Sequence, residues 1–149
     1  MNAEILKLEN QLCFPLYAAA KAMVKKYTPF LNEIGLTYTQ YIVMMVLWEW
    51  ETISVKKLGE YLYLDSGTLT PLLKRLESKK LISRSRATED ERFVYISITH
   101  DGARLKEKAI QVPQKMSECL SLEPQEAQTL YTSLHKLLGK LEVRMFASD

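Results

Sequence analysis

Glycine and proline are scarce in this 149-residue chain, which has five of each, while hydrophobic residues make up 47%. That composition argues against a disordered protein, and no repeat or low-complexity segment occurs. The longest apolar run, Ile42–Trp48, is far too short to cross a bilayer, and residues 1–7 lack a signal-peptide apolar block. We therefore expect one cytoplasmic domain with a real core and no membrane partner.

Cysteine and histidine are equally scarce, with two of each. No Cys-x-x-Cys motif occurs, which excludes a thioredoxin-like dithiol, and a cytoplasmic protein has no need of a structural disulfide. His100 and His135 have no further ligand at metal-binding spacing, and no glycine-rich phosphate loop is present. Ser66 has no histidine partner for acyl transfer. We therefore expect neither a metal nor another cofactor, and no enzyme.

A strong charge of one sign is also missing, because the formal net charge is only +2. Its distribution is more informative. The segment Lys56–Arg92 contains nine Lys/Arg and six Asp/Glu, a local charge of +3, which leaves −1 for the rest of the chain. This modest excess is consistent with nucleic-acid binding, although an ordinary solvated face would explain it too.

The stretch 64–77 has the pattern of an amphipathic helix. Its leucines recur at i, i+3, i+4 and i+7 and form one apolar face: Leu69, Leu72, Leu73 and Leu76. Off this stripe lie hydroxyls and cations, which reach base edges and phosphates in DNA-binding proteins. Asp65 or Ser66 can cap a start at 65, whereas Pro71 alone favours a start with Thr70 as N-cap. The earlier start costs one hydrogen bond and a slight kink at Pro71.

Residues 79–98 have the pattern of a two-stranded ribbon. A polar turn at 88–92 separates its halves, and residues 93–98 alternate, with Val94, Ile96 and Ile98 on one face. A helix followed by a ribbon with a charged tip is typical of a winged helix-turn-helix, although an ordinary surface hairpin is the alternative. We predict that these residues bind DNA: Asp65, Ser66, Thr68, Thr70, Lys74, Arg75, Arg84, Arg86 and Arg92.

The remaining chain is predicted to be helical, so the fold class is mainly α with a small β wing. One helix is expected over 4–31, kinked at Pro15, and a break at 32–36 follows it, with Gly35 as the C-terminal stop. Capping residues indicate helices after Thr37 and Ser54, and Thr99 opens a helix to about 117 that Pro113 bends. The last helix is expected over 124–145, with an apolar stripe: Leu130, Leu134, Leu137, Leu138 and Leu141.

The two terminal segments are too long and too apolar for one small domain to bury. We expect a homodimer in which residues 1–34 and 100–149 are dimerisation helices and residues 35–99 form the winged helix-turn-helix lobe. The alternative is that the terminal helices pack on their own subunit.

Cys13 lies near several tyrosines of the predicted helices. Tyr17 is one turn away, whereas Tyr27 is on a similar face but roughly 21 Å along the helix at about 1.5 Å per residue. An antiparallel second subunit could bring Tyr27 and Tyr38 to the sulfur, where hydroxyl donors favour the nucleophilic thiolate. The alternative is that Cys13 is a small buried hydrophobe.

With these residues placed, the chain resembles the MarR family of winged-helix repressors, and within it the organic hydroperoxide resistance regulators. Three segments carry the resemblance, Gln11–Tyr17, Leu36–Tyr41 and Leu64–Leu76, together with Asp90-Glu91-Arg92. The family pattern implies that the second helix of the DNA-binding motif starts near Asp65. Pro15 departs from several relatives, which have a small residue there.

The resemblance also implies roles for individual residues. Cys13 would be the peroxide-sensing thiol, Tyr27 and Tyr38 would bind its sulfur from the partner subunit, and Tyr17 would be a nearby ring. Arg92 would enter the minor groove. In the two-cysteine branch a resolving cysteine stands near the C-terminal helix, where this chain has Cys119.

The function that the resemblance implies is a thiol-based, peroxide-sensing transcriptional repressor. The reduced homodimer would bind a pseudo-palindromic operator in double-stranded DNA, and oxidation of Cys13 by an organic hydroperoxide would release it. Two alternatives stay open. One is a MarR-type repressor gated by a small aromatic ligand, with Cys13 structural, and the other is a helical cysteine peroxidase.

Overall fold

The computed structural model describes residues 2–145, with side chains as far as residue 141, and divides into two compact units, Met1–Lys115 and Met116–Asp149. Its elements, in chain order, are the 3-10 helices η1 (Ala3–Leu6) and η2 (Leu8–Asn10), α1 (Cys13–Asn32), α2 (Tyr38–Trp50), β1 (Thr52–Ser54), α3 (Val55–Leu62), α4 (Ser66–Ser78), β2 (Ile82–Arg86), β3 (Val94–Ile98), α5 (His100–Ala109), α6 (Val112–Leu120) and α7 (Pro124–Met145). The predicted fold class, mainly α with a β wing, is confirmed.

Helix α2 is the centre of the first unit. Thr37 caps it with the predicted capping box, in which the Thr37 hydroxyl accepts from the Gln40 amide and the Gln40 side chain accepts from the Thr37 amide. Its side chains at Val43, Met44 and Leu47 are fully buried. They pack with the leucine stripe of α4 in one hydrophobic core, so α2 positions the DNA-binding elements.

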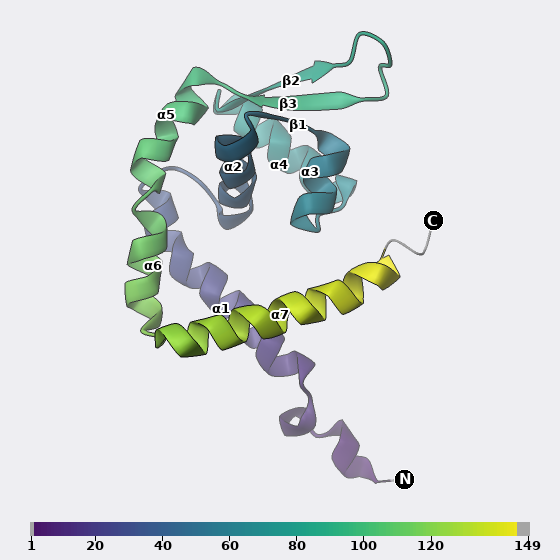
Figure 1. Ribbon diagram of the computed structural model, residues 1–149, viewed down its shortest axis with the longest axis vertical. Helices are drawn as coiled ribbons and strands as arrows, with labels where there is room; N and C mark the ends of the chain where they lie inside the picture. Colours follow the sequence, from purple (N-terminus) through teal and green to yellow (C-terminus); the bar gives the residue numbers. More distant parts are fainter. Residues whose placement is uncertain (1, 146–149) are drawn as a thin grey trace. The chain divides into compact units, whose positions relative to one another are not determined.

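The wing belongs to a three-stranded antiparallel sheet rather than to the two-stranded ribbon that was predicted. Its strand order is β1-β3-β2, with Ile53 of β1 and Arg84 of β2 both opposite Ile96 of β3. Figure 1 shows α2, α3 and α4 on one side of this sheet, while β2 and β3 continue past β1 as a hairpin. Strand β1 has only three residues, too few to show the alternation by which strands are recognised.

The predicted helix over 4–31 is wrong at its start, because α1 begins only at Cys13. Pro15 is the third residue of α1, where an N–H has no intrahelical partner, so it does not kink the helix. Its ring would clash with the Gln11 carbonyl of a longer helix, which explains why η1 and η2 precede α1 instead. The Gln11 side-chain amide donates to the Ile5 and Lys7 carbonyls of that segment, at 2.6 and 3.1 Å.

The predicted helix over 100–117 is divided near Pro113, where a bend was expected. Helix α5 ends at Ala109 and α6 begins at Val112. Pro113 has no N–H to donate to the Ala109 carbonyl four residues earlier, and its ring crowds that carbonyl. The predicted start of the last helix near Pro124 is confirmed. None of the helices in the described part of the chain is long and apolar enough to cross a membrane.

Candidate nucleic-acid interface and thiol site

Helix α4 starts where the family pattern implied. Asp65 is its N-cap, and the Asp65 carboxylate accepts a hydrogen bond of 2.7 Å from the Thr68 amide. That backbone hydrogen bond lowers the pKa of Asp65 below its usual value. Pro71 lies inside α4, which nevertheless runs unbroken to Ser78. The local preference for a start at Thr70 is therefore wrong, because the cap and the buried leucines outweigh one lost hydrogen bond.

The two faces of α4 separate as predicted. Its four leucines are at most 6% exposed, and they hold the helix against the core. The predicted DNA-binding side chains of this helix are all exposed: Ser66, Thr68, Thr70, Lys74 and Arg75. Short hydroxyls and long cations thus share one open helix face, the arrangement used for reading the major groove.

The wing strand β2 is joined to α4 by an ion pair. The Arg84 guanidinium donates to the Glu77 carboxylate at 2.7 Å, and both side chains are about one-third to one-half exposed. The Arg86 guanidinium donates to the Glu91 carbonyl in the hairpin loop at 3.1 Å. Of the predicted wing arginines, Arg84 therefore pairs with α4, whereas Arg86 pairs with the hairpin loop.

Arg92 stands at the tip of the wing. Its guanidinium forms a two-pronged interaction with the Asp90 carboxylate, with Nη2 to Oδ2 at 2.8 Å and Nε to Oδ1 at 3.0 Å, while 89% of its side chain remains exposed. The Arg92 hydrogen bonds lower the pKa of Asp90 and raise that of Arg92, so both groups stay charged. Asp90 thereby holds the Arg92 guanidinium at the wing tip, exposed to solvent.

Cys13 is the first residue of α1 and is exposed. Tyr17, one turn later, is also exposed, with the Lys21 ammonium 5.9 Å from its ring centroid. Within this chain Tyr27 is four turns further along α1, roughly 21 Å at about 1.5 Å per residue, and so does not reach the sulfur. The alternative that Cys13 is a small buried hydrophobe does not describe the single chain, in which Cys13 is exposed.

Tyr27 and Tyr38 come together away from Cys13. Their ring centroids are 5.0 Å apart, and Tyr27 lies 6.0 Å from Tyr41, which in turn lies 6.2 Å from Trp48. We call these four rings the aromatic row. Burial raises the pKa of Tyr27 and of Tyr41, with neighbouring phenols adding to it, so both hydroxyls stay protonated and can act as donors. Tyr41 was not predicted; its position three residues after Tyr38 on α2 is the signal that could have found it.

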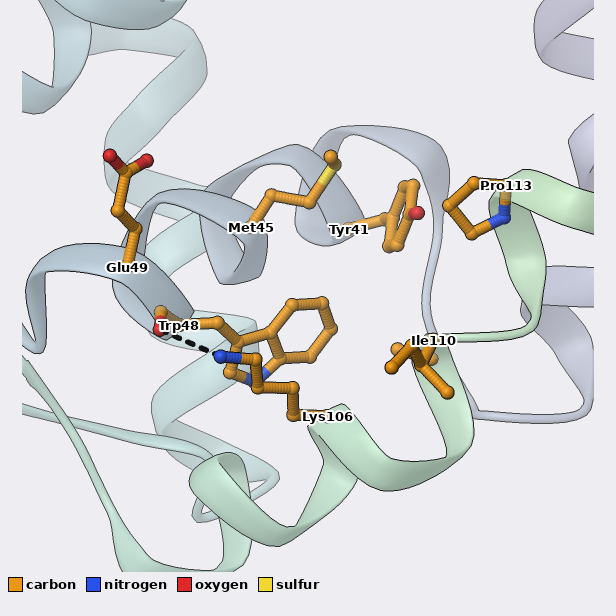
Figure 2. A pocket seen from close by; sticks show the side chains of 8 residues that line it. Tyr41, Met45, Trp48, Glu49, Lys106, Ile110 and Pro113 are labelled. Carbon is orange, nitrogen blue, oxygen red and sulfur yellow. Dashed lines mark hydrogen bonds between the residues drawn. The ribbon is translucent and has the colours of Figure 1, made fainter.

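An apolar pocket adjoins the aromatic row. It has a volume of about 330 Å³ and is lined by residues of α2, α5 and the start of α6: Tyr41, Met45, Trp48, Glu49, Lys106, Ala109, Ile110 and Pro113. Figure 2 shows Tyr41 and Trp48 reaching from α2 toward Ile110 and Pro113. The Lys106 ammonium donates to the Trp48 carbonyl at 3.3 Å and places a positive charge at the edge of the pocket.

Cys119 is exposed and lies one residue before the end of α6, in the second unit, whereas Cys13 belongs to the first. Among the side chains that the structure describes, no group of three or more His, Cys, Asp or Glu residues could hold a metal ion.

A capped helix with exposed hydroxyls and cations, ion-paired to a charged hairpin, defines a winged-helix transcriptional regulator. The family model for the transcriptional regulators SarA/Rot matches residues 25–109. The chain belongs to this family of MarR-like winged-helix regulators, as predicted.

Individual relatives are similar over nearly the whole chain. An organic hydroperoxide resistance transcriptional regulator of Bacillus subtilis is 52% identical over 136 residues, 91% of this chain and 92% of that protein. The regulator SarZ of Staphylococcus epidermidis is 42% identical over 140 residues, 94% and 95% of the two chains. AbfR of Staphylococcus epidermidis has been solved in several states. Its reduced form bound to DNA has a TM-score of 0.75 at 35% identity, covering 95% of this chain and 99% of AbfR. Its disulfide form has a TM-score of 0.63 at 36% identity, covering 91% and 95%.

Proposed function

We propose that this protein is a thiol-based, redox-sensing repressor in which Cys13 is the sensor and an organic hydroperoxide is the oxidant. The reduced homodimer binds operator DNA, and oxidation releases it. The observation that carries this proposal is the exposed Cys13 at the start of α1, within a chain that otherwise has the DNA-binding elements of a winged-helix regulator. The chain acts by changing its affinity for DNA and not by catalytic turnover.

A second copy of the chain completes the sensing site. Apolar side chains of α1 stand exposed in the single chain, among them Phe14, Leu16 and Val24, and so do Leu130 and Tyr131 of α7. Large apolar side chains exposed on long helices in this number are typical of a surface that another subunit covers. In the proposed dimer α1 of one subunit presents Cys13 to the Tyr27–Tyr38 pair of the other, whose phenolic hydroxyls can donate hydrogen bonds to a thiolate.

The chemistry needs no cofactor. The Cys13 thiolate attacks the terminal oxygen of the hydroperoxide and the O–O bond breaks, which leaves a sulfenic acid on sulfur and releases the alcohol after proton transfer. The peroxide is reduced and the thiol oxidised by two electrons. A peroxide titration of the purified protein, read by operator binding and by a count of free thiols, tests this: DNA should be lost in step with the consumption of the Cys13 thiol.

On DNA, α4 enters the major groove and the wing reaches the neighbouring minor groove. The exposed hydroxyls and cations of α4 contact bases and phosphates, and Arg92, held out from the tip by Asp90, inserts beside the backbone. Because most of these contacts are to phosphates, affinity should fall steeply with added salt.

Arg92→Ala is expected to weaken operator binding by about 10- to 100-fold, which corresponds to about 1–3 kcal/mol for one well-placed arginine. Folding should be unaffected, because this side chain is 89% exposed and its guanidinium is paired with Asp90 on the same exposed turn. The measurement is operator affinity by fluorescence anisotropy. Arg104→Ala, which removes the same charge from an exposed position on α5, is the control. Wild-type affinity in Arg92→Ala would show that the wing tip does not contact DNA.

Cys119 is the proposed resolving thiol. Its sulfur attacks the Cys13 sulfenic acid of the partner subunit, so that an S–S bond forms, the S–O bond breaks and water leaves. Two observations support this role. Cys119 is exposed near the end of α6, and the relative AbfR exists in a disulfide form. A disulfide requires the two Cα atoms to approach within about 7 Å, so its formation would constrain how the helices of the dimer lie.

Stoichiometric organic hydroperoxide is therefore expected to produce a covalent dimer on a non-reducing gel, and dithiothreitol should remove it. The band should be absent from both Cys13→Ser and Cys119→Ser. If the wild type stays monomeric on the gel and mass spectrometry finds only a small-thiol adduct on Cys13, Cys119 has no resolving role.

The apolar pocket beside the aromatic row favours a second candidate function, a repressor gated by a small aromatic ligand. Its volume of about 330 Å³ lies within the range of small-molecule sites, and Lys106 could pair with an anionic group. The peroxide titration separates the candidates, because a purely ligand-gated repressor would keep its DNA while peroxide is added. A peroxidase would instead consume many equivalents of peroxide when supplied with a reductant.

A further inference from the structure

The last turn of α4 is joined to the turn between α1 and α2 by one side chain. Lys79 is the C-cap of α4, and its backbone amide donates to the Arg75 carbonyl at 3.1 Å. The Lys79 ammonium donates to acceptors outside α4: the Gly35 carbonyl and, at 3.0 Å, the side-chain oxygen of Gln40. Lys79 thus spans from the DNA-reading helix to the start of α2.

Gln40 links the Lys79 contact to the cap of helix α2. Gln40 is only 3% exposed, and the side-chain oxygen that accepts from Lys79 also accepts from the Thr37 amide at 3.1 Å, as part of the capping box. Thr37 directly precedes Tyr38, whose ring lies against Tyr27. A displacement of Tyr38 therefore moves the cap of α2, and with it the acceptors that hold Lys79.

The neighbouring residues hold the same end of α4 to α5. The Thr99 hydroxyl donates to the Lys80 carbonyl at 2.7 Å, and the Thr99 amide to the Leu81 carbonyl at 3.1 Å. A Cβ on Gly102 would clash with that Leu81 carbonyl oxygen, so α5 packs closely on the chain that leaves α4. The end of α4 is therefore held on one side by the start of α5 and on the other by the start of α2. Lys79 makes the contact with α2, the helix that begins at Tyr38.

We propose that Lys79 is a positioning residue that couples the state of the Tyr27–Tyr38 pair to the orientation of α4. The inference rests on the proposed function, because it assigns the route by which oxidation at Cys13 changes DNA affinity. In the reduced protein the Lys79 hydrogen bonds to Gln40 and Gly35 hold α4 in the DNA-binding orientation. When oxidation of the sulfur rearranges Tyr38, the start of α2 shifts and α4 is pulled from that orientation.

The physical basis is that charge-assisted hydrogen bonds to a buried amide and to a backbone carbonyl are directional and costly to stretch. Without them the two elements still share the apolar core, but a shift of one no longer requires a shift of the other. The quantity that reports this is the ratio of operator dissociation constants in the oxidised and reduced states, because it measures the coupling between the two sites.

The test is Lys79→Met, which keeps the aliphatic stem and removes the donors. The oxidised-to-reduced ratio of dissociation constants should fall at least about threefold, while Cys13 is oxidised at the wild-type rate and the melting temperature hardly changes. Lys80→Met removes the same charge from the adjacent exposed position and should leave the ratio unchanged, which separates coupling from loss of attraction to phosphates. Gln40→Glu retains both acceptor functions and should keep the wild-type ratio.

An unchanged ratio in Lys79→Met, or an equal fall in Lys80→Met, would overturn the coupling role while leaving the proposed function intact. A slower oxidation of Cys13 in Lys79→Met that accounts for the whole effect would also overturn it, since Lys79 would then act on the sensor. A wild-type protein that keeps its operator after complete oxidation of Cys13 would overturn the proposed function and, with it, the coupling.

Discussion

Cys13→Ser is expected to bind operator as tightly as the wild type and to lose its response to organic hydroperoxide entirely. A serine hydroxyl is nearly isosteric with a thiol, and Cys13 lies on α1, outside the helix and wing that face DNA, so the reduced-state affinity should not change. The hydroxyl is a poor nucleophile toward peroxide oxygen and cannot form a sulfenic acid, so the signal cannot begin.

The measurement is operator binding by anisotropy before and after stoichiometric organic hydroperoxide, with free thiols counted in the same samples. Cys119→Ser is the matched control, since it removes the other exposed thiol. It should still release DNA at first, because sulfenic acid formation precedes the disulfide. A Cys13→Ser protein that releases its operator normally would place the sensing thiol elsewhere.

Inserting roughly five base pairs between the operator half-sites is expected to reduce affinity by about 100-fold or more, to near the non-specific level. Two symmetry-related copies of α4 reach successive major grooves on one side of DNA when the half-sites are about 10–10.5 base pairs apart. Half a helical turn puts one half-site on the far side, where the second lobe of a rigid dimer cannot follow.

An insertion of one full turn is the matching control, because it restores the face but lengthens the span. It should recover part of the loss if the dimer can stretch, and none if it is rigid. Sedimentation of the free protein at micromolar concentration should show a dimer. A stable monomer that binds the intact operator tightly and ignores the insertion would contradict both the dimer and the paired half-sites.

Local chemistry made much of the DNA-binding lobe predictable. The capping box at Thr37, the cap at Asp65 and the leucine stripe of α4 each depend on residues within one or two helical turns, and each is present in the structure. The same local rules failed where two of them compete. Pro15 lies in the first turn of α1, where no side chain of residues 11–17 is buried, whereas Pro71 lies inside α4, which the Asp65 cap and four buried leucines stabilise.

The sequence by itself determined most of the helical segments, although not where α1 begins, and also which face of α4 is open and that the chain carries two thiols and a charged wing tip. Only the tertiary structure decided which distant residues meet: β1 beside β3, Arg84 with Glu77, Lys79 with Gln40, and Tyr27 between Tyr38 and Tyr41. Periodicity and capping report interactions within a few residues along the chain. Contacts between residues far apart in sequence form only when the shared apolar core brings their elements together. Local sequence patterns therefore do not predict them.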